Sequence, residues 1–216
     1  MPRLLFEKTG DSVWISHLDL MRVFQRAFRR AGLLLKHSQG FTPRAIVSIA
    51  LPLSVGVESC CELLDYELEQ DAAVTPELLN EKLPAGIHVL EIIENGRKIK
   101  ELTQLRAVIK MAYDNGVPSD LQEQLTELFE RDALMIEKHS RKGKTETNIL
   151  PMLLQWSLTV TGETTAELEV LVCAQNPSLN PQLLVTAMEL YAPQILPSHA
   201  MIRRLEVYDA EGKAFR

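Results

Sequence analysis

The feature that most constrains this fold is the order in which strand-like and helix-like segments follow one another. Residues 3–8 form a short apolar run that predicts a strand, and residues 9–11 read as a turn. Ser16 can cap a helix that begins at His17, and Gly32 is placed to end it. The chain therefore opens with a strand followed by an amphipathic helix.

Four further segments extend this order to residue 93. They are strands over 45–51, 60–69 and 87–93, and a short helix that begins at Thr75-Pro76 and ends at Pro84-Ala85-Gly86. Residues 52–59 form a connection or a bulged strand. The first half thus reads strand, helix, strand, strand, helix, strand, which is the split βαβ, ferredoxin-like plan.

The second half approximates the same plan after a polar linker at residues 94–98. Expected strands cover 105–112, 135–138, 149–153, 155–160, 166–174 and 199–208, and expected helices run from 119–121 to about 131 and from 180–181 to about 191. We therefore predict an α+β fold of two ferredoxin-like (βαββαβ) lobes in tandem, 1–97 and 104–216, the second with an extra hairpin. A length of 216 residues also permits one larger α+β domain.

Composition excludes several classes of protein. With 46% apolar and 24% charged residues the chain is typical of a folded globular domain. No stretch approaches the roughly 20 apolar residues of a membrane-spanning helix, and the first eight residues meet charge too early for a signal peptide. We expect a cytoplasmic protein. Cys60, Cys61 and Cys173 have the spacing of neither a disulfide framework nor a metal site, which favours thiols with a packing role.

Positive charge is concentrated in the first fifty residues. They hold eight lysines and arginines against three acids, a net charge of +5, which leaves −11 for the remainder of a chain whose total is −6. Such an asymmetry can attract a polyanion locally, although a solvated helix face has the same composition.

The charge within the helix of residues 17–31 has a definite phase. At 100° per residue an apolar stripe faces one side and four arginines face the other. The apolar stripe consists of Leu20, Met21, Phe24, Ala27, Phe28 and Ala31, and the arginines are Arg22, Arg26, Arg29 and Arg30. Asp19 is the one acid of this helix that can pair with them, so the arginine stripe is largely unneutralised within its own helix.

A second basic cluster lies at residues 138–144. It reads Lys138-His139-Ser140-Arg141-Lys142-Gly143-Lys144 and predicts a loop or hairpin tip, because the glycine allows a tight backbone turn. Such a tip can contact phosphates, and it can equally be a solvated hairpin. Both interpretations stay open.

Motifs of the common enzyme classes are absent from the sequence. There is no glycine-rich phosphate loop, nucleophile elbow or His-Glu-x-x-His site. His17 and Asp19 resemble a metal pair, but helix capping explains the acid better. No catalytic residue, metal or cofactor is assigned, and His17, His37 and His139 are the plausible general acid–base groups if the protein is an enzyme.

Several sequence blocks carry a family resemblance. They span residues 6–11, 15–22, 28–33, 38–41 and 52–59, and include Arg141-Lys142-Gly143-Lys144. In these blocks the chain resembles the radical-SAM-linked uncharacterised domain family. The resemblance implies an accessory role near RNA metabolism, beside a radical S-adenosylmethionine (SAM) enzyme or fused behind one.

This sequence departs from the family pattern in two places. The family tends to continue Asn-Pro-His-Pro-Lys where this chain has Thr42-Pro43-Arg44-Ala45-Ile46, and Asn148 stands where an acid is expected. Both departures weaken a catalytic interpretation and leave the basic surface intact. The chain also lacks the Cys-x-x-x-Cys-x-x-Cys motif that holds a [4Fe–4S] cluster in radical SAM enzymes, so it is not the radical enzyme itself.

Three hypotheses follow. The leading one is a non-catalytic accessory protein that binds transfer or ribosomal RNA, or presents an RNA-related substrate to a radical SAM partner. The alternatives are a scaffold that docks on that partner without nucleic acid, and an RNA-processing or modifying enzyme that uses histidine. The expected contact residues are Arg22, Arg26, Arg29, Arg30, Lys36, His37, Gln39, Arg44, Lys138, His139, Arg141, Lys142 and Lys144.

Overall fold

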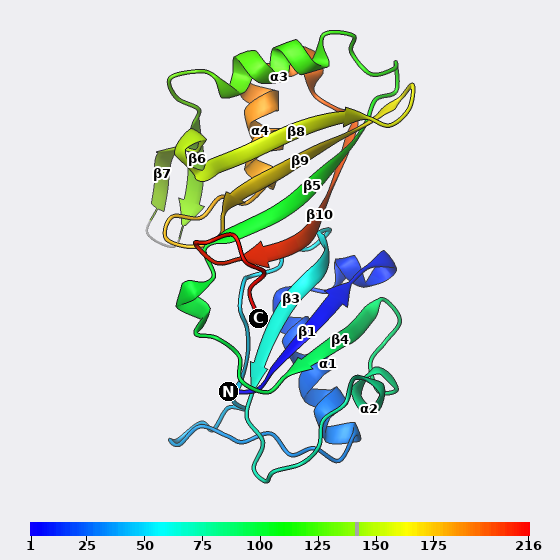
Figure 1. The fold of residues 1–216 in the computed structure, drawn as a ribbon, viewed down its shortest axis with the longest axis vertical. Helices are drawn as coiled ribbons and strands as arrows, with labels where there is room; N and C mark the ends of the chain where they lie inside the picture. Colours follow the sequence, from blue (N-terminus) through cyan, green and yellow to red (C-terminus); the bar gives the residue numbers. More distant parts are fainter. Residues whose placement is uncertain (141–142) are drawn as a thin grey trace. The chain divides into compact units, whose positions relative to one another are not determined.

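The computed structural model describes residues 1–140 and 143–216, without the side chains of residues 138–140 and 144. The chain divides into two compact units. The first unit contains Met1–Glu101 with Arg204–Glu206 and Ala214–Arg216, and the second contains Leu102–Arg203 with Val207–Lys213. The architecture is mixed α+β, with mostly antiparallel strands and few helices (Figure 1).

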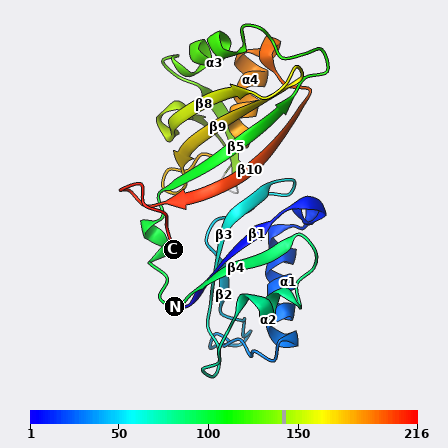
Figure 2. The same cartoon turned by 45° about the vertical axis from the view of Figure 1, so that its right-hand side comes forward.

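The first unit has a four-stranded antiparallel arrangement. Its elements are β1 (Arg3–Lys8), a 3₁₀ turn (Gly10–Trp14), α1 (His17–Arg30), β2 (Val47–Ile49), β3 (Glu58–Tyr66), α2 (Pro76–Asn80), β4 (Ile87–Ile93) and a second 3₁₀ turn (Ile99–Glu101). The strands follow the order β4-β1-β3, and β2 pairs with the other edge of β3 (Figure 2). Each of these neighbours is antiparallel.

Helix α1 packs on this sheet through one apolar stripe and passes behind β1 and β3 in Figure 1. Phe24 contacts Phe6 of β1 with ring centroids 4.6 Å apart, and Phe28 contacts Tyr66 of β3 at 4.9 Å. Burying each phenylalanine stabilises the fold by about 1.5–3 kcal/mol. The opposite side of α1, which carries the arginines, therefore faces away from the sheet.

Buried polar groups fix the chain just before α1. Lys8 is fully buried, and its Nζ donates hydrogen bonds of 2.9 Å to the carbonyls of Val13 and Ile15. Burial lowers the pKa of Lys8, whereas the nearby Glu62 acts to raise it. At the start of α1, Ser16 Oγ accepts a hydrogen bond from the backbone N–H of Asp19, so the predicted cap is confirmed.

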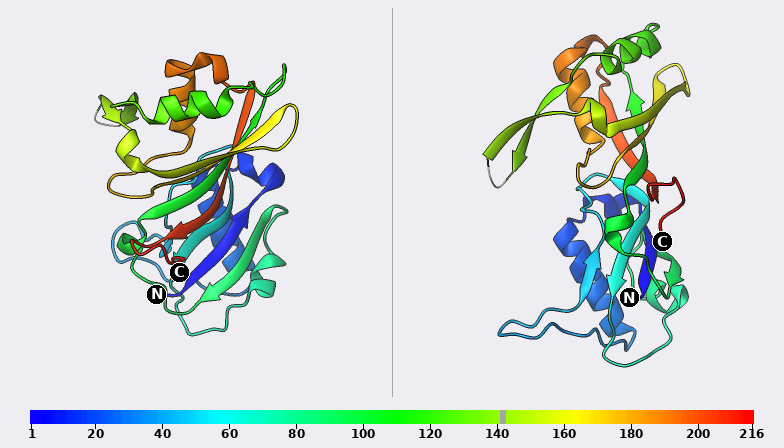
Figure 3. Two further views of the ribbon diagram at one scale, coloured as in Figure 1. Left: turned by 45° about the horizontal axis from the view of Figure 1, so that its top comes forward. Right: turned by 60° about the vertical axis from the view of Figure 1, so that its left-hand side comes forward.

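The second unit contains a four-stranded arrangement and a separate hairpin. Its elements are β5 (Gln104–Ala112), α3 (Leu121–Phe129), β6 (Met135–Ser140), β7 (Gly143–Asn148), a 3₁₀ turn (Leu150–Met152), β8 (Leu153–Val160), β9 (Thr165–Cys173), α4 (Gln182–Tyr191), a further 3₁₀ turn (Pro193–Ile195) and β10 (His199–Tyr208). The strand order is β10-β5-β9-β8, and β6 pairs with β7 alone. Helices α3 and α4 lie on the same side of this sheet (Figure 3).

Alternation along β5 separates the two faces of that sheet. Ala107 and Ile109 are buried, and Ala107 is in register with Val170, which pairs in turn with Trp156. The Trp156 ring contacts Phe129 of α3 at 5.2 Å, so this face is the helix-covered core. The intervening residues of β5 therefore present their side chains on the open face.

Most sequence-predicted elements are found, and three need correction. The strands predicted at 3–8, 87–93 and 199–208 have these same bounds. The strand predicted over 45–51 contains residues 47–49 alone, and the strand predicted over 60–69 runs from Glu58 to Tyr66. The strand predicted over 149–153 is instead mainly a 3₁₀ turn, because Pro151 has no N–H for a sheet hydrogen bond.

The boundaries predicted for the two lobes, 1–97 and 104–216, stay a prediction. In the structure the division between the two units lies between Glu101 and Leu102, and six residues near the C-terminus belong to the first unit.

Among the described residues, no helix has the length and apolar character needed to cross a bilayer.

Candidate nucleic-acid interface

Two adjoining cavities lie along the exposed side of α1. One has a volume of about 630 Å³ and the other of about 590 Å³, and both are lined by Arg22, Gln25, His37 and Ala45. The first also contacts Arg26 and Arg29, and the second contacts Arg44. We call the two cavities together the α1 groove.

The helix wall of the α1 groove follows from sequence spacing. Arg22, Arg26 and Arg29 are four and three residues apart, which places their side chains one above another on a single helix face. All three are exposed, while Phe24 and Phe28 are buried on the other side. The predicted phase of this helix is therefore confirmed, except that Met21 and Ala31, both predicted in the core stripe, are half-buried, and Met21 lines the groove.

The wall of the groove opposite α1 is formed by residues between Leu33 and Val47. Leu35 forms an isolated antiparallel β-bridge with Leu68, and His37 forms another with Ala45. The backbone N–H of Ser38 donates to the carbonyl of Arg44 at 2.8 Å, and the N–H of Arg44 donates to Ser38 Oγ at 3.1 Å. These bonds close a loop over residues 38–44 whose base lines the groove.

Part of the positive charge in this region is neutralised. Arg22 pairs with Asp19 at 2.7 Å, and both side chains are more than half exposed. Hydrogen bonds from Ser16 and then Arg22 lower the pKa of Asp19. Outside α1, Lys36 pairs with Glu67 at 3.0 Å.

Other arginines of the groove keep their charge unpaired. Among the residues that the structure describes, none forms an ion pair with Arg26, Arg29 or Arg44. A guanidinium has five N–H donors in a planar fork that matches a phosphate or carboxylate. The α1 groove thus presents several always-charged donors to its two adjoining cavities.

The remaining sequence-predicted contact residues are less closely gathered. Arg30 is exposed at the last turn of α1, and Gln39 is exposed in the 38–44 loop, but neither lines the groove. In the β6–β7 hairpin, Lys138 is in register with Thr145 and His139 with Lys144, which places them near its tip. The side chains of Lys138, His139 and Lys144, and all of Arg141 and Lys142, lie outside the described residues.

The histidines give a mixed outcome for acid–base chemistry. His37 and Glu69 both line the α1 groove, with 3.9 Å between His37 Nδ1 and Glu69 Oε1, which is longer than a hydrogen bond. His17 does not line the groove, and its Nδ1 is buried without a hydrogen-bond partner. One imidazole and one carboxylate therefore share a cavity, and of the two candidate histidines whose side chains are described, His37 lines it and His17 does not.

The acid and the thiol that were considered for metal or thiol chemistry have structural roles in the described part of the chain. No group of three or more histidine, cysteine or acidic side chains there is arranged to hold a metal ion. Asp19 is engaged by Ser16 and Arg22, as capping predicts. Cys61 is buried, and burial raises its thiol pKa, which agrees with a packing role.

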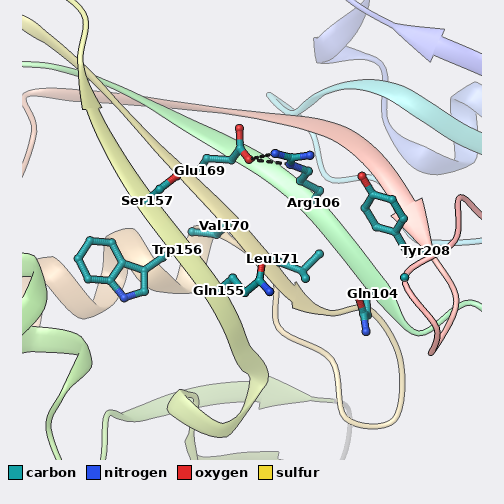
Figure 4. A pocket seen from close by; sticks show the side chains of 10 residues that line it. Gln104, Arg106, Gln155, Trp156, Ser157, Glu169, Val170, Leu171 and Tyr208 are labelled. Atoms are coloured by element: carbon teal, nitrogen blue, oxygen red, sulfur yellow. Dashed lines mark hydrogen bonds and ion pairs between the residues drawn. The ribbon is translucent and has the colours of Figure 1, made fainter.

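Sequence reasoning missed a further cavity, on the open face of the second unit's sheet. We call this cavity, of about 400 Å³, the sheet pocket. Figure 4 shows its side chains, which come from β5, β8, β9 and β10 and include Gln104, Arg106, Gln155, Glu169 and Tyr208. Its signal in the sequence was the alternation of polar Gln104, Arg106 and Lys110 with apolar neighbours.

The sheet pocket holds a paired arginine. Arg106 Nε donates to Glu169 Oε1 at 2.6 Å, and its Nη2 contacts the same oxygen. Hydrogen bonds first to Glu169 and then to Tyr208 raise the pKa of Arg106. With its one arginine matched by a carboxylate, this pocket is polar but carries no excess positive charge from that pair.

Residues 2–181 match the model of a family described as "Uncharacterized protein conserved in bacteria (DUF2344)". The match spans most of the sequence, so the chain belongs to this family. A search of curated proteins finds no match.

Two solved structures share the fold. The chain is similar over 95% of its length to a chain in the crystal structure of a Cbf5-Nop10-Gar1 complex, with a TM-score of 0.54 and 10% identity. It is similar over 98% of its length to a chain in the structure of an H/ACA RNP bound to a substrate RNA containing 2′-deoxyuridine, with a TM-score of 0.50 and 11% identity. The chain spans about half of each of those chains, 48% in both cases. At such low identity the likeness concerns the fold.

Proposed function

We propose that this member of the DUF2344 family is a non-catalytic accessory protein that binds RNA through the α1 groove. The observation that carries the proposal is that Arg22, Arg26, Arg29 and Arg44 line one groove, and that three of the four form no ion pair with any residue that the structure describes. Transfer or ribosomal RNA is the expected ligand. A cytoplasmic location is part of the same proposal.

Phosphate is the group that this arrangement suits best. Arginine binds phosphate with two parallel hydrogen bonds, and an exposed stripe at helical spacing can contact successive phosphates. The chain as a whole carries a net charge of −6, so the attraction is local to this surface. The basic tip at residues 138–144 is proposed as a further phosphate contact in the second unit.

The arrangement of strands supports two ferredoxin-like lobes as part of the proposal. The orders β4-β1-β3-β2 in the first unit and β10-β5-β9-β8 in the second are the same when the strands are numbered within each unit and the β6–β7 hairpin is left out. Helices occupy equivalent places, and the β6–β7 hairpin is inserted between α3 and β8. One of the structures that share the fold is a ribonucleoprotein with bound substrate RNA, which agrees with a role in RNA binding.

A radical SAM enzyme is the proposed protein partner. The support is the sequence resemblance carried by residues 6–11, 15–22 and 52–59. Since this chain lacks the cysteine motif for an iron–sulfur cluster, its part is to hold or present the RNA-related substrate while the partner supplies the radical chemistry.

Fluorescence anisotropy with labelled transfer RNA tests the RNA-binding proposal. Wild-type protein binds at low salt, and log K falls by roughly 0.7–0.9 per neutralised phosphate as log salt rises. The double variant Arg26→Glu/Arg29→Glu loses binding. The matched control is Lys98→Glu/Lys100→Glu, which makes the same change in net charge at two exposed lysines outside the groove and retains binding. The proposal is wrong if wild type does not bind, or if the two double variants bind alike.

A second candidate function is a scaffold that docks on the radical SAM partner without RNA. It is favoured by exposed apolar side chains around the start of α1, namely Trp14, Leu18 and Val55, which are 71%, 68% and 52% exposed. Co-purification of the partner from the native host, with and without ribonuclease, separates the two functions. A complex that survives the nuclease and requires Arg22 and Arg26 supports the scaffold.

A further inference from the structure

We propose that the α1 groove accepts an unpaired RNA strand, with its phosphates against the arginines of α1 and one base stacked on Phe41. This inference rests on the proposed function and specifies its substrate class. Three features carry it: the walls of the groove, the exposed aromatic residue of the adjoining 38–44 loop, and the single acidic residue that lines the groove.

The walls leave room for one strand. Arg22 and Arg29 are seven residues apart, which is about 11 Å along an α-helix. Beside them stands the segment from Leu33 to His37, held at Leu35 by the bridge to Leu68. The major groove of an RNA duplex is deep and narrow, and a helix flanked by such a wall cannot enter it. The two cavities, of about 630 and 590 Å³, are each in the size range that holds a small molecule such as a nucleotide.

Phe41 supplies an aromatic surface in the 38–44 loop, whose base, at Pro43 and Arg44, lines this groove. It lies in the loop closed by the hydrogen bonds between Ser38 and Arg44, and its side chain is fully exposed, at 110% relative accessibility. Among the described residues no aromatic ring packs against it. Aromatic side chains on a basic groove stack with bases of single strands, and this interaction needs a base that is free of its own helix.

Glu69 is the acidic residue in the wall of the larger cavity. A carboxylate repels phosphate, but it accepts hydrogen bonds from the amino groups of bases, such as N4 of cytosine. In a duplex the Watson–Crick edge that carries these groups is occupied by pairing. An unpaired strand, by contrast, can direct its phosphates to Arg26 and Arg29 and a base edge to Glu69.

The test compares one RNA in two states. Fluorescence anisotropy measures binding of a short, unstructured RNA of alternating cytidine and adenosine, alone and annealed to its complement. We expect the single strand to bind at least about 10-fold more tightly than the duplex, because stacking and base contacts are available to it alone. Equal affinities, or tighter binding of the duplex, overturn the inference.

Variants of Phe41 locate the stacking. Base–aromatic stacking of about 1–3 kcal/mol corresponds to a loss of about 5- to 150-fold in single-strand affinity for Phe41→Ala, and duplex affinity stays unchanged. Phe41→Trp, which keeps an aromatic ring at this position, binds the single strand as tightly as wild type. The control is Leu190→Ala, another large apolar side chain that is 61% exposed, which changes neither affinity. Single-strand binding that is unaffected by Phe41→Ala contradicts the inference.

The same experiment distinguishes failure of this inference from failure of the proposed function. If neither RNA binds wild type, the proposed RNA binding is wrong and the inference is wrong with it. If single strand and duplex bind equally and both need Arg26 and Arg29, the proposed RNA binding is supported. Only the inference that the groove prefers an unpaired strand is then wrong. An acidic polypeptide such as polyglutamate that displaces the single strand at equal charge concentration also overturns the inference, because it shows that the groove recognises charge without a base.

Discussion

The α1 groove and the sheet pocket both contain arginine, and they differ in what surrounds it. In the groove Arg26, Arg29 and Arg44 have no ion-pair partner among the described residues. In the sheet pocket Arg106 is held by Glu169 and Tyr208. The lining of the sheet pocket has one arginine and one glutamate, so of these two surfaces the groove retains the charge that an anion could neutralise.

From this difference we expect ion pairing, together with the number of arginines, to decide whether a surface binds an anion. A guanidinium already bonded to a carboxylate has fewer donors left, and removing it from that partner costs free energy before any ligand is bound. Two predictions on the effect of arginine pairing test this comparison directly, and two more compare the stability of the units that carry the two surfaces.

The largest expected effect is on RNA affinity. We expect Arg26→Ala/Arg29→Ala to weaken binding by about 100-fold or more, since hydrogen bonds to charged groups are each worth about 1.5–3 kcal/mol. Arg106→Ala should change the affinity less than about two-fold, because its guanidinium is already paired. Anisotropy with the same labelled RNA measures both. A large loss for Arg106→Ala would show that the sheet pocket, and not the groove, contacts RNA.

The sequence was sufficient for features that depend on near neighbours. Helix α1 could be predicted because its cap at Ser16, its apolar stripe and the end at Gly32 all lie within one short segment. Gly32 adopts a positive φ of 77°, which a glycine allows at little cost. The sequence predicts a strand in place of the 3₁₀ turn at 150–152, because the apolar residues around Pro151 are typical of a strand. The missing N–H of Pro151 is the feature that opposes a strand there.

The site was predicted in part for the same reason. The arginines of α1 share one helix, so their common face follows from spacing alone. The facing wall depends on bridges between residues distant in sequence, such as Leu35 with Leu68, and Glu69 enters the groove through that pairing. The sheet pocket depends on the register of four strands, which a single sequence does not specify.

A second prediction compares the stability of the two units in alkali. Burial raises the pKa of Tyr66 in the first unit and of Tyr113 in the second to about 12, from an ordinary value near 10. Because the folded-state pKa is raised, each tyrosine contributes stability that is complete below pH 10 and is lost as the pH rises from 10 to 12. The loss approaches about 3 kcal/mol per tyrosine, at 1.36 kcal/mol per pKa unit.

Urea unfolding at pH 9 and at pH 11.5 measures this loss. Tyr66→Phe should remove the alkaline loss from the first unit, and Tyr113→Phe from the second. Tyr113→Phe should also cost about 1 kcal/mol at neutral pH, because the Tyr113 hydroxyl donates a 3.1 Å hydrogen bond to the carbonyl of Ile195. Unchanged alkaline sensitivity in both variants would mean that other groups control it.

The third prediction concerns the start of α1. Ser16→Ala should destabilise the first unit by about 1 kcal/mol, because the Asp19 N–H loses the Ser16 Oγ acceptor. Ser157→Ala is the matched control in the second unit, since this serine is exposed on β8 and its loss should stay within about 0.5 kcal/mol. Thermal unfolding monitored by circular dichroism measures both. Equal destabilisation would show that the cap contributes nothing to α1.

The smallest expected effect comes from converting the sheet pocket toward the groove. Glu169→Gln leaves Arg106 in place but removes the carboxylate that neutralises it. Stability should fall by less than about 1 kcal/mol, because the pair is well exposed, with side chains at 47% and 37%. RNA affinity should rise by less than about five-fold, since one freed guanidinium on an open sheet face lacks the facing wall and the neighbouring arginines of the α1 groove. Anisotropy in the Arg26→Ala/Arg29→Ala background isolates this gain from binding at the groove. If Glu169→Gln restores that double variant to wild-type affinity, a single unpaired arginine is enough for RNA binding, and the arrangement of arginines along α1 has no special role.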